Sequence, residues 1–116
     1  MSDTYELFQL GRRHLRDGMA AQATVALEKA KRREPSSRSI REALGIAYFR
    51  LRRYDEAEAE FRAALEISPV DDYAHYVLGR CLEKQGKLNE ANGHYMLASS
   101  LRPRNTHYRR RIRNLG

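Results

Sequence analysis

The chain has 116 residues, which is enough for one domain with a modest core. Lys and Arg number 22 against 15 Asp and Glu, so the net charge of +7 favours anionic partners, although such a surplus also serves solubility alone. The one cysteine, Cys81, excludes an intrachain disulfide and is typical of a reducing compartment. No run of 18 apolar residues and no leader pattern occurs, so we expect a cytoplasmic protein with no membrane contact.

Small residues and prolines recur along the chain with a period of 34 residues. The twelve matching positions, which need no insertion, are Gly11, Gly45 and Gly79; Ala23, Ala57 and Ala91; Ala30, Ala64 and Ala98; and Pro35, Pro69 and Pro103. Within each period the apolar residues have helical spacing in two stretches. The sequence therefore predicts three helical hairpins that bury their apolar faces only by packing on one another.

The first unit, residues 4–37, keeps Gly11 and Leu27 but has His14 where the next unit has a tyrosine. Its two helices are predicted to meet at a turn that contains Gly18. Terminal repeats are often atypical because one side faces water, so these departures fit an N-terminal repeat.

The middle unit, residues 38–71, has the clearest pattern. We predict that Asp55 is the N-cap of its second helix, which ends near Pro69. Gly45 and Ala57 lack bulk where the two helices must cross, so a larger side chain at either position should overpack the core.

The third unit, residues 72–105, has Gly86 in its predicted turn and Asn89 as the predicted cap of its second helix. Ser37, Asp71 and Asn105 occupy the N-cap position before each following helix. Asn105 therefore predicts a seventh helix over residues 106–115, whose apolar residues would cover the open end of the third unit.

The pattern L-G-x-x-Y, then A-x-x-x-F-x-x-A, then P at this period resembles the tetratricopeptide repeat over residues 4–105. The resemblance implies an all-α fold: a right-handed α-solenoid of three helix-turn-helix repeats plus a C-terminal capping helix, forming one domain over residues 1–116. It also implies a non-catalytic scaffold whose first helices line a concave groove for a peptide or protein. The early aromatic common in such repeats is replaced by Leu7, Arg41 and His75.

The predicted groove residues lie on the first helix of each unit, opposite the buried stripe. They are Tyr5, Phe8, Arg12, Arg16, Glu42, Ile46, Phe49, Arg50, Tyr73, Tyr76, Arg80 and Lys84. Aromatic side chains and a basic ladder together predict a partner segment with apolar anchors and acidic flanks. The alternative is that neighbouring repeats or the C-terminal helix cover part of the aromatic stripe.

Repeat domains that bind the acidic C-termini of heat-shock chaperones use Lys, Asn and Arg at defined positions of the first helices. The corresponding residues here are Phe8, Arg12, Ala43, Tyr73 and Val77, of which only Arg12 is charged. The resemblance therefore does not extend to that carboxylate clamp.

Two further functions stay open, and a third is disfavoured. Six arginines in residues 102–116 could bind nucleic acid, although a solvated cap is the simpler interpretation of a charge run. An open end face could also support a homo-oligomer. No catalytic motif, metal-ligand spacing or phosphate loop occurs, so we expect no enzyme activity, metal or cofactor.

Overall fold

The computed structural model describes residues 3–113, which fold into seven helices with no strand in that range. The helices are α1 (Thr4–Arg16), α2 (Ala20–Arg33), α3 (Arg38–Arg50), α4 (Tyr54–Ile67), α5 (Asp72–Lys84), α6 (Leu88–Leu101) and α7 (Thr106–Arg111). Consecutive helices pack as antiparallel pairs, and each pair packs on the next. The seven predicted helices are therefore present in the predicted order.

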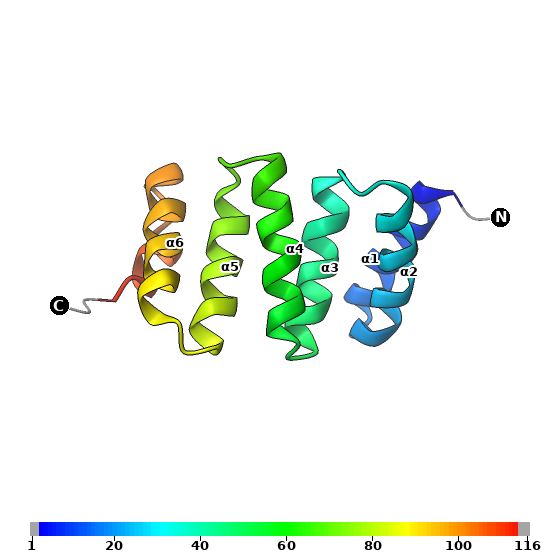
Figure 1. The fold of residues 1–116 in the computed structure, drawn as a ribbon, viewed down its shortest axis with the longest axis horizontal. Helices are drawn as coiled ribbons and strands as arrows, with labels where there is room; N and C mark the ends of the chain where they lie inside the picture. The colour runs from blue at the N-terminus through cyan, green and yellow to red at the C-terminus, as the bar shows by residue number, and fades with distance from the viewer. Residues whose placement is uncertain (1–2, 114–116) are drawn as a thin grey trace.

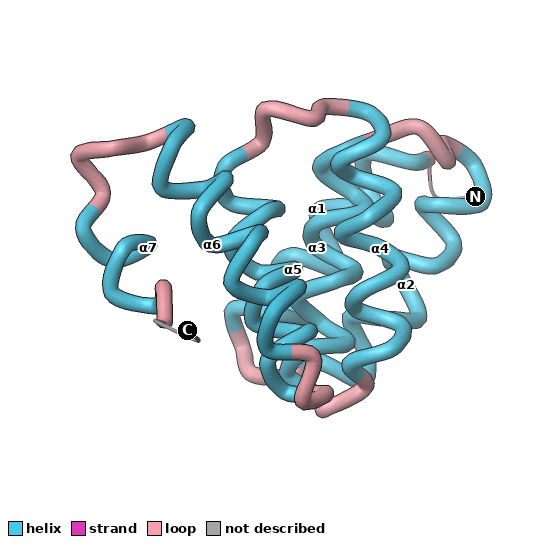
Figure 2. Tube along the Cα trace, turned by 60° about the vertical axis from the view of Figure 1, so that its left-hand side comes forward, coloured by secondary structure: helices cyan, strands magenta, loops and turns pink. Residues whose placement is uncertain are grey.

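The helices stand side by side along an elongated body of 54 × 24 × 21 Å, with the first and last hairpins at opposite ends of the long axis (Figure 1). The first helices of the hairpins, α1, α3 and α5, form one layer, and α2, α4 and α6 form the other. The short helix α7 lies against the last hairpin (Figure 2). The layer of α1, α3 and α5 carries the candidate site.

Each of the three repeated glycines faces a large side chain of its own hairpin partner. A Cβ atom at Gly11, Gly45 or Gly79 would lie 2.5 Å from an atom of Leu27, Phe61 or Tyr95, respectively. No neighbouring atom can lie so close to a real Cβ atom, so only glycine permits these helix crossings. This confirms the packing role predicted for the repeated glycine.

The turns inside the hairpins use one left-handed residue each. Gly18, Arg52 and Gly86 have φ angles of 74°, 62° and 79°. Glycine takes this conformation without steric cost, whereas Arg52 must tolerate it in the middle unit.

Helix starts follow two different rules. The side chains of Ser37, Asp71 and Asn105 accept hydrogen bonds from the first turns of α3, α5 and α7, as predicted. The predicted caps Asp55 and Asn89 are wrong.

The left-handed turn already fixes where the second helix of a hairpin begins. The N–H of Arg53 donates to the Tyr48 carbonyl at 2.9 Å, and the N–H of Lys87 donates to the Leu82 carbonyl at 2.9 Å. Arg53 and Lys87 occupy the N-cap positions, and neither side chain makes a capping bond. Asp55 lies within the first turn of α4 instead, where its charge still favours the helix dipole.

Two of the three positions that lack the family's early aromatic residue carry polar side chains bonded to a backbone carbonyl, whereas Leu7 is part of the core. Arg41 Nε donates to the Pro35 carbonyl at 2.9 Å, and one repeat later His75 Nε2 donates to the Pro69 carbonyl at 2.9 Å. The other ring nitrogen of His75, Nδ1, lies 3.1 Å from His94 Nδ1, within hydrogen-bond distance. Hydrogen bonds thus replace aromatic packing between consecutive repeats.

The C-terminal helix is shorter than predicted. It ends at Arg111, with Ile112 as C-cap, whereas the prediction ran to residue 115, which lies outside the described residues. Tyr108 is buried, and its hydroxyl donates to Asp72 at 2.7 Å. The helix therefore covers the last hairpin in the predicted manner.

Candidate functional site

Two adjacent hollows lie on the face formed by α1, α3 and α5. The α1–α3 hollow, of about 320 Å³, is lined by Phe8, Arg12, Leu15, Arg16, Ser39, Glu42, Ala43, Ile46 and Arg50. The α3–α5 hollow, of about 300 Å³, is lined by Ile46, Phe49, Arg50, Tyr73, Tyr76, Val77 and Arg80. Since both share Ile46 and Arg50, they form one groove with a ridge in the middle.

The structure brings most of the predicted groove residues together in these hollows. Two do not line either one: Tyr5, whose side chain is 69% exposed, and Lys84 at the end of α5. Ala43 and Val77 line the groove although neither was among its predicted residues. The small side chain of Ala43 gave no signal for a binding site, because its size also suits the core.

Tyr76 departs from the prediction of a free aromatic side chain. It is only 7% exposed, because its ring packs 5.0 Å from that of Tyr108 and its hydroxyl lies 2.7 Å from His107 Nε2. The alternative interpretation, burial by the C-terminal helix, is therefore correct for this residue. Tyr76 forms the closed wall at one end of the groove.

The cations of the predicted groove make no ion pair with any described residue. Arg12 lies over the Phe8 ring and Arg80 over the Phe49 ring, each 5.5 Å from the ring centre. Arg50 Nη1 donates to the Leu15 carbonyl at 2.6 Å. Aromatic faces and a backbone carbonyl hold these guanidinium groups in place without neutralising their charge.

Glu42 contributes the one carboxyl group among the lining residues. Burial, followed by a hydrogen bond with Asp71, raises the pKa of Glu42 to about 8. Glu42 Oε1 is a buried oxygen without a hydrogen-bond donor among the described residues, and a proton on Glu42 lets this carboxyl group donate to Asp71. Asp71 Oδ2 in turn lies 3.5 Å from Arg38 Nη1. At neutral pH the groove is therefore more positive than its residue count suggests.

This carboxyl group predicts that the free energy of unfolding falls as the pH rises. The pKa of Glu42 rises from an ordinary value of 4.5 to about 8 on folding. The stabilising contribution of the protonated group is therefore fully present below pH 4.5 and is lost as the pH rises through about 8. We expect a loss of about 2 kcal/mol between about pH 4.5 and about pH 8 after solvent screening. Urea denaturation across this range measures it.

Glu42→Gln is the matched variant, because its amide can donate to Asp71 at every pH. The variant should therefore lack the pH-dependent loss. Parallel declines of the wild type and the variant would show that another group titrates.

Among the described residues, neither the cysteine thiol nor the potential metal ligands are arranged for catalysis or metal binding. Cys81 is buried, and burial raises the pKa of its thiol to about 12. Within residues 3–113 no group of three or more His, Cys, Asp or Glu side chains is placed to hold a metal ion. In the same range no helix is both long enough and apolar enough to span a bilayer.

A two-layer stack of helical hairpins with an unneutralised cationic groove defines a helical-repeat interaction protein. Two family models described as tetratricopeptide repeat match residues 8–72 and residues 51–110. The chain belongs to the tetratricopeptide repeat family.

Two curated relatives match most of this chain. The phagocyte signaling-impaired protein of Drosophila pseudoobscura pseudoobscura is 33% identical over 92 residues, which are 79% of this chain and 10% of the relative. Superkiller complex protein 3 of Mus musculus is 31% identical over 84 residues, which are 72% of this chain and 5% of the relative. The chain thus spans a tenth or less of the length of these relatives.

Solved structures confirm the predicted right-handed α-solenoid. A crystal structure of MamA matches with a TM-score of 0.93 at 23% identity, covering 95% of this chain and 64% of that one. The first repeat domain of Spaghetti (RPAP3), bound to the HSP90 peptide SRMEEVD, matches with a TM-score of 0.90 at 22% identity, covering 94% of this chain and 86% of that one. The Yersinia enterocolitica chaperone SycD, in complex with a peptide of the translocator YopD, matches with a TM-score of 0.84 at 20% identity, covering 95% of this chain and 85% of that one.

Proposed function

We propose that the groove on α1, α3 and α5 binds a segment of a partner protein and performs no chemical step. The segment presents apolar side chains to the two hollows and acidic side chains to the groove cations. The observation that carries the proposal is the combination, on one face, of apolar hollows and arginines that have no described ion-pair partner. Two structural neighbours were solved with peptides, which supports a peptide ligand for this fold.

The partner we propose differs from the acidic chaperone C-terminus. Phe8, Ala43, Tyr73 and Val77 occupy four of the clamp positions, and none has a charged or amide side chain. We also propose that residues 1–116 form one cytoplasmic domain with repeats at about 4–37, 38–71 and 72–105.

Binding should depend on the aromatic wall of the α3–α5 hollow. We expect Phe49→Ala to weaken binding of a groove-selected peptide at least about tenfold, because an apolar anchor loses its main contact. Peptides selected from a display library against the wild-type chain, then titrated by fluorescence anisotropy, provide the measurement.

Tyr5→Ser is the matched control, because Tyr5 is an exposed aromatic residue outside both hollows. It should leave the affinity within about twofold. Circular dichroism checks that Phe49→Ala still folds, since Phe49 also packs edge-on against Tyr54 at 5.3 Å. A peptide that binds the wild type and a folded Phe49→Ala variant equally well would show that the groove is not its site.

The two alternative functions keep their own tests. Arg102 pairs with Asp72, and Arg111 and Arg113 pair with Glu83, so half of the six tail arginines support the fold. Nucleic-acid binding would require a steep loss of affinity with salt and its abolition on removal of residues 106–116. Self-association would appear as concentration-dependent sedimentation.

A further inference from the structure

We infer that the groove recognises one acidic side chain placed between two apolar side chains of the partner segment, and that Arg50 binds the acid. This inference depends on the proposed function, because it assigns the ligand chemistry of the same groove.

The ridge between the hollows determines the order of the ligand groups. Ile46 and Arg50 are four residues apart on α3, so they lie on one face of the helix and both line the two hollows. A ligand that fills both hollows must cross this ridge. Its middle residue therefore meets the Arg50 guanidinium, while its flanking residues meet the aromatic rings on either side.

A hydrogen bond to the backbone fixes the Arg50 guanidinium in a position where it can bind an anion. Its Nη1 is fixed by the Leu15 carbonyl at 2.6 Å, near the negative end of the α1 dipole, and its other N–H groups have no described acceptor. The side chain is exposed and forms no ion pair within residues 3–113. A guanidinium group fixed in this way loses little freedom when its planar fork binds a carboxylate.

Arg80 adds positive potential to the same ridge from the other side. It stacks on Phe49, and its Nε is buried without a hydrogen-bond partner among the described residues. Arg80 is half-buried, and a buried guanidinium N–H without an acceptor is costly, which favours a ligand that brings negative charge to the α3–α5 hollow.

The one carboxyl group that lines the groove does not oppose this ligand. Glu42 lines the α1–α3 hollow, but the same burial and contact with Asp71 that raise its pKa keep it protonated at neutral pH. An internal acid is favoured over a chain-terminal carboxylate because a chain end at the ridge could extend into only one hollow.

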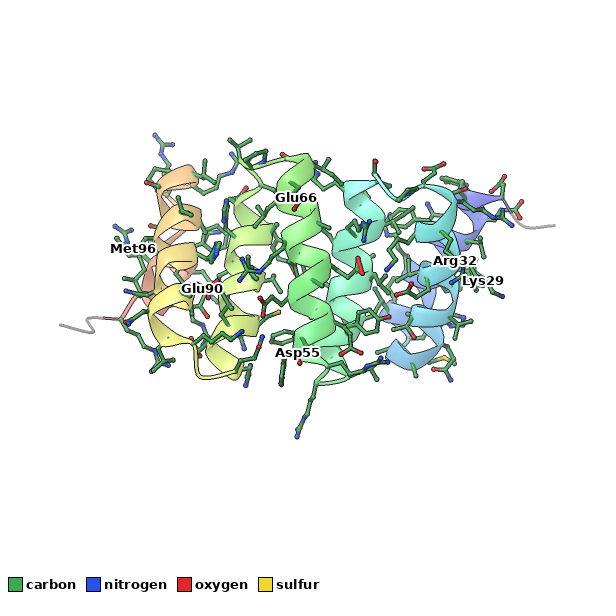
Figure 3. All side chains as sticks on the ribbon, in the orientation of Figure 1. Lys29, Arg32, Asp55, Glu66, Glu90 and Met96 are labelled. Carbon is green, nitrogen blue, oxygen red and sulfur yellow. The ribbon has the colours of Figure 1, made fainter. Side chains whose placement is uncertain are left out.

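A small set of synthetic peptides tests the inference directly. Each has an acetylated N-terminus, an amidated C-terminus, and two Leu or Phe residues separated by one to three residues around a central Glu, Gln or Lys. Fluorescence anisotropy at about 0.1 M salt compares the wild type with Arg50→Gln, Arg80→Gln and the control Arg32→Gln. Arg32 is exposed on α2, where Figure 3 labels it, and it lines neither hollow.

The Glu peptide should bind the wild type at least about tenfold tighter than its Gln analogue. Arg50→Gln should reduce this preference to about twofold, Arg80→Gln should reduce it partly, and Arg32→Gln should leave it unchanged. An analogue with a free C-terminal carboxylate after a single anchor should bind no better than the Gln peptide.

Three outcomes overturn the inference. Equal binding of Glu and Gln peptides, both weakened by Phe49→Ala, rejects acid recognition and leaves the groove as the binding site. Preference for the free-carboxylate analogue rejects the internal acid. Failure of every peptide rejects the inference, and it also rejects the proposed function if library selection yields no peptide sensitive to Phe49→Ala.

Discussion

Gly45→Ala is expected to lower the free energy of unfolding by about 2–3 kcal/mol, although alanine is the better helix former. The added methyl group would lie 2.5 Å from Cε2 of Phe61, whose ring is fully buried, so close packing in the core resists its displacement. Either the ring leaves its rotamer or α3 and α4 separate. Urea denaturation followed by circular dichroism measures the effect.

Gly93→Ala is the matched control in the same fold. Gly93 is an exposed position of α6, and a Cβ atom added there would have no neighbouring atom within 4 Å. The substitution should raise stability by about 0.5–1 kcal/mol through helix propensity alone. If both glycine variants shift stability in the same direction, steric contact is not the cause.

A double-mutant cycle isolates the contact. In a Phe61→Ala background the methyl group at position 45 has room, so Gly45→Ala should cost almost nothing there. The same cost in both backgrounds would show that the ring is not the obstacle.

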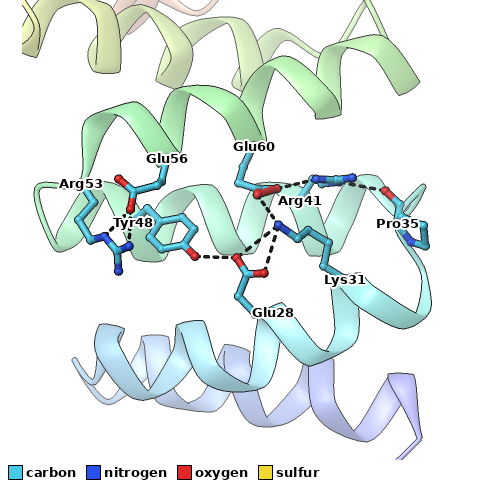
Figure 4. A network of polar contacts seen from close by, with 8 residues as sticks. All are labelled: Glu28, Lys31, Pro35, Arg41, Tyr48, Arg53, Glu56 and Glu60. Atoms are coloured by element: carbon cyan, nitrogen blue, oxygen red, sulfur yellow. Dashed lines mark hydrogen bonds and ion pairs between the residues drawn. The ribbon is translucent and has the colours of Figure 1, made fainter.

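Glu60→Ala is expected to destabilise the protein by about 3 kcal/mol. The buried Glu60 carboxylate accepts from Lys31 of α2 and from Arg41 of α3, each at 2.9 Å (Figure 4). Removing the carboxylate leaves Arg41 without an ion-pair partner among the described residues and Lys31 with Glu28 alone, and it breaks the link between the first and second hairpins. Thermal and urea denaturation of the folded chain provide the measurement.

Glu56→Ala is the control for a carboxylate on the same helix. Glu56 pairs with Arg53 on the exposed surface, as Figure 4 also shows, so its loss should change stability by less than about 0.5 kcal/mol. Replacing Arg41 by Met together with Glu60→Leu removes the unpaired charge while Lys31 keeps its pair with Glu28, so this double variant should recover most of the lost stability. Failure to recover it would mean that packing, rather than unpaired charge, explains the loss.

The Glu60 pairs also explain a departure in the first repeat. Lys31 stands where the middle repeat has Leu65, which within the repeat pattern indicates a terminal unit exposed to water. The structure places Lys31 between the first and second hairpins instead. The pattern within one repeat does not show a partner that lies 29 residues away in the next.

The repeat and the packing inside each hairpin could be predicted from the amino-acid sequence alone. The 34-residue period repeats one local contact in each hairpin, between a glycine and a large side chain 16 residues later, as in Gly45 and Phe61. Because this contact is local and repeated, its register is evident from the spacing. The basic residues on the first helices were sufficient to predict a cationic groove. The side chains at the positions of the carboxylate clamp were sufficient to predict that this clamp is missing.

Which groove side chains are free and which are covered became clear only from the folded chain. Tyr73 remains partly exposed, while Tyr76, three residues later, lies under Tyr108 of the C-terminal helix. Helical periodicity assigns both tyrosines to the same stripe, because it describes one helix and contains no information about what packs on it. Burial here depends on a contact between residues 32 positions apart, and such contacts form only when the whole chain is folded.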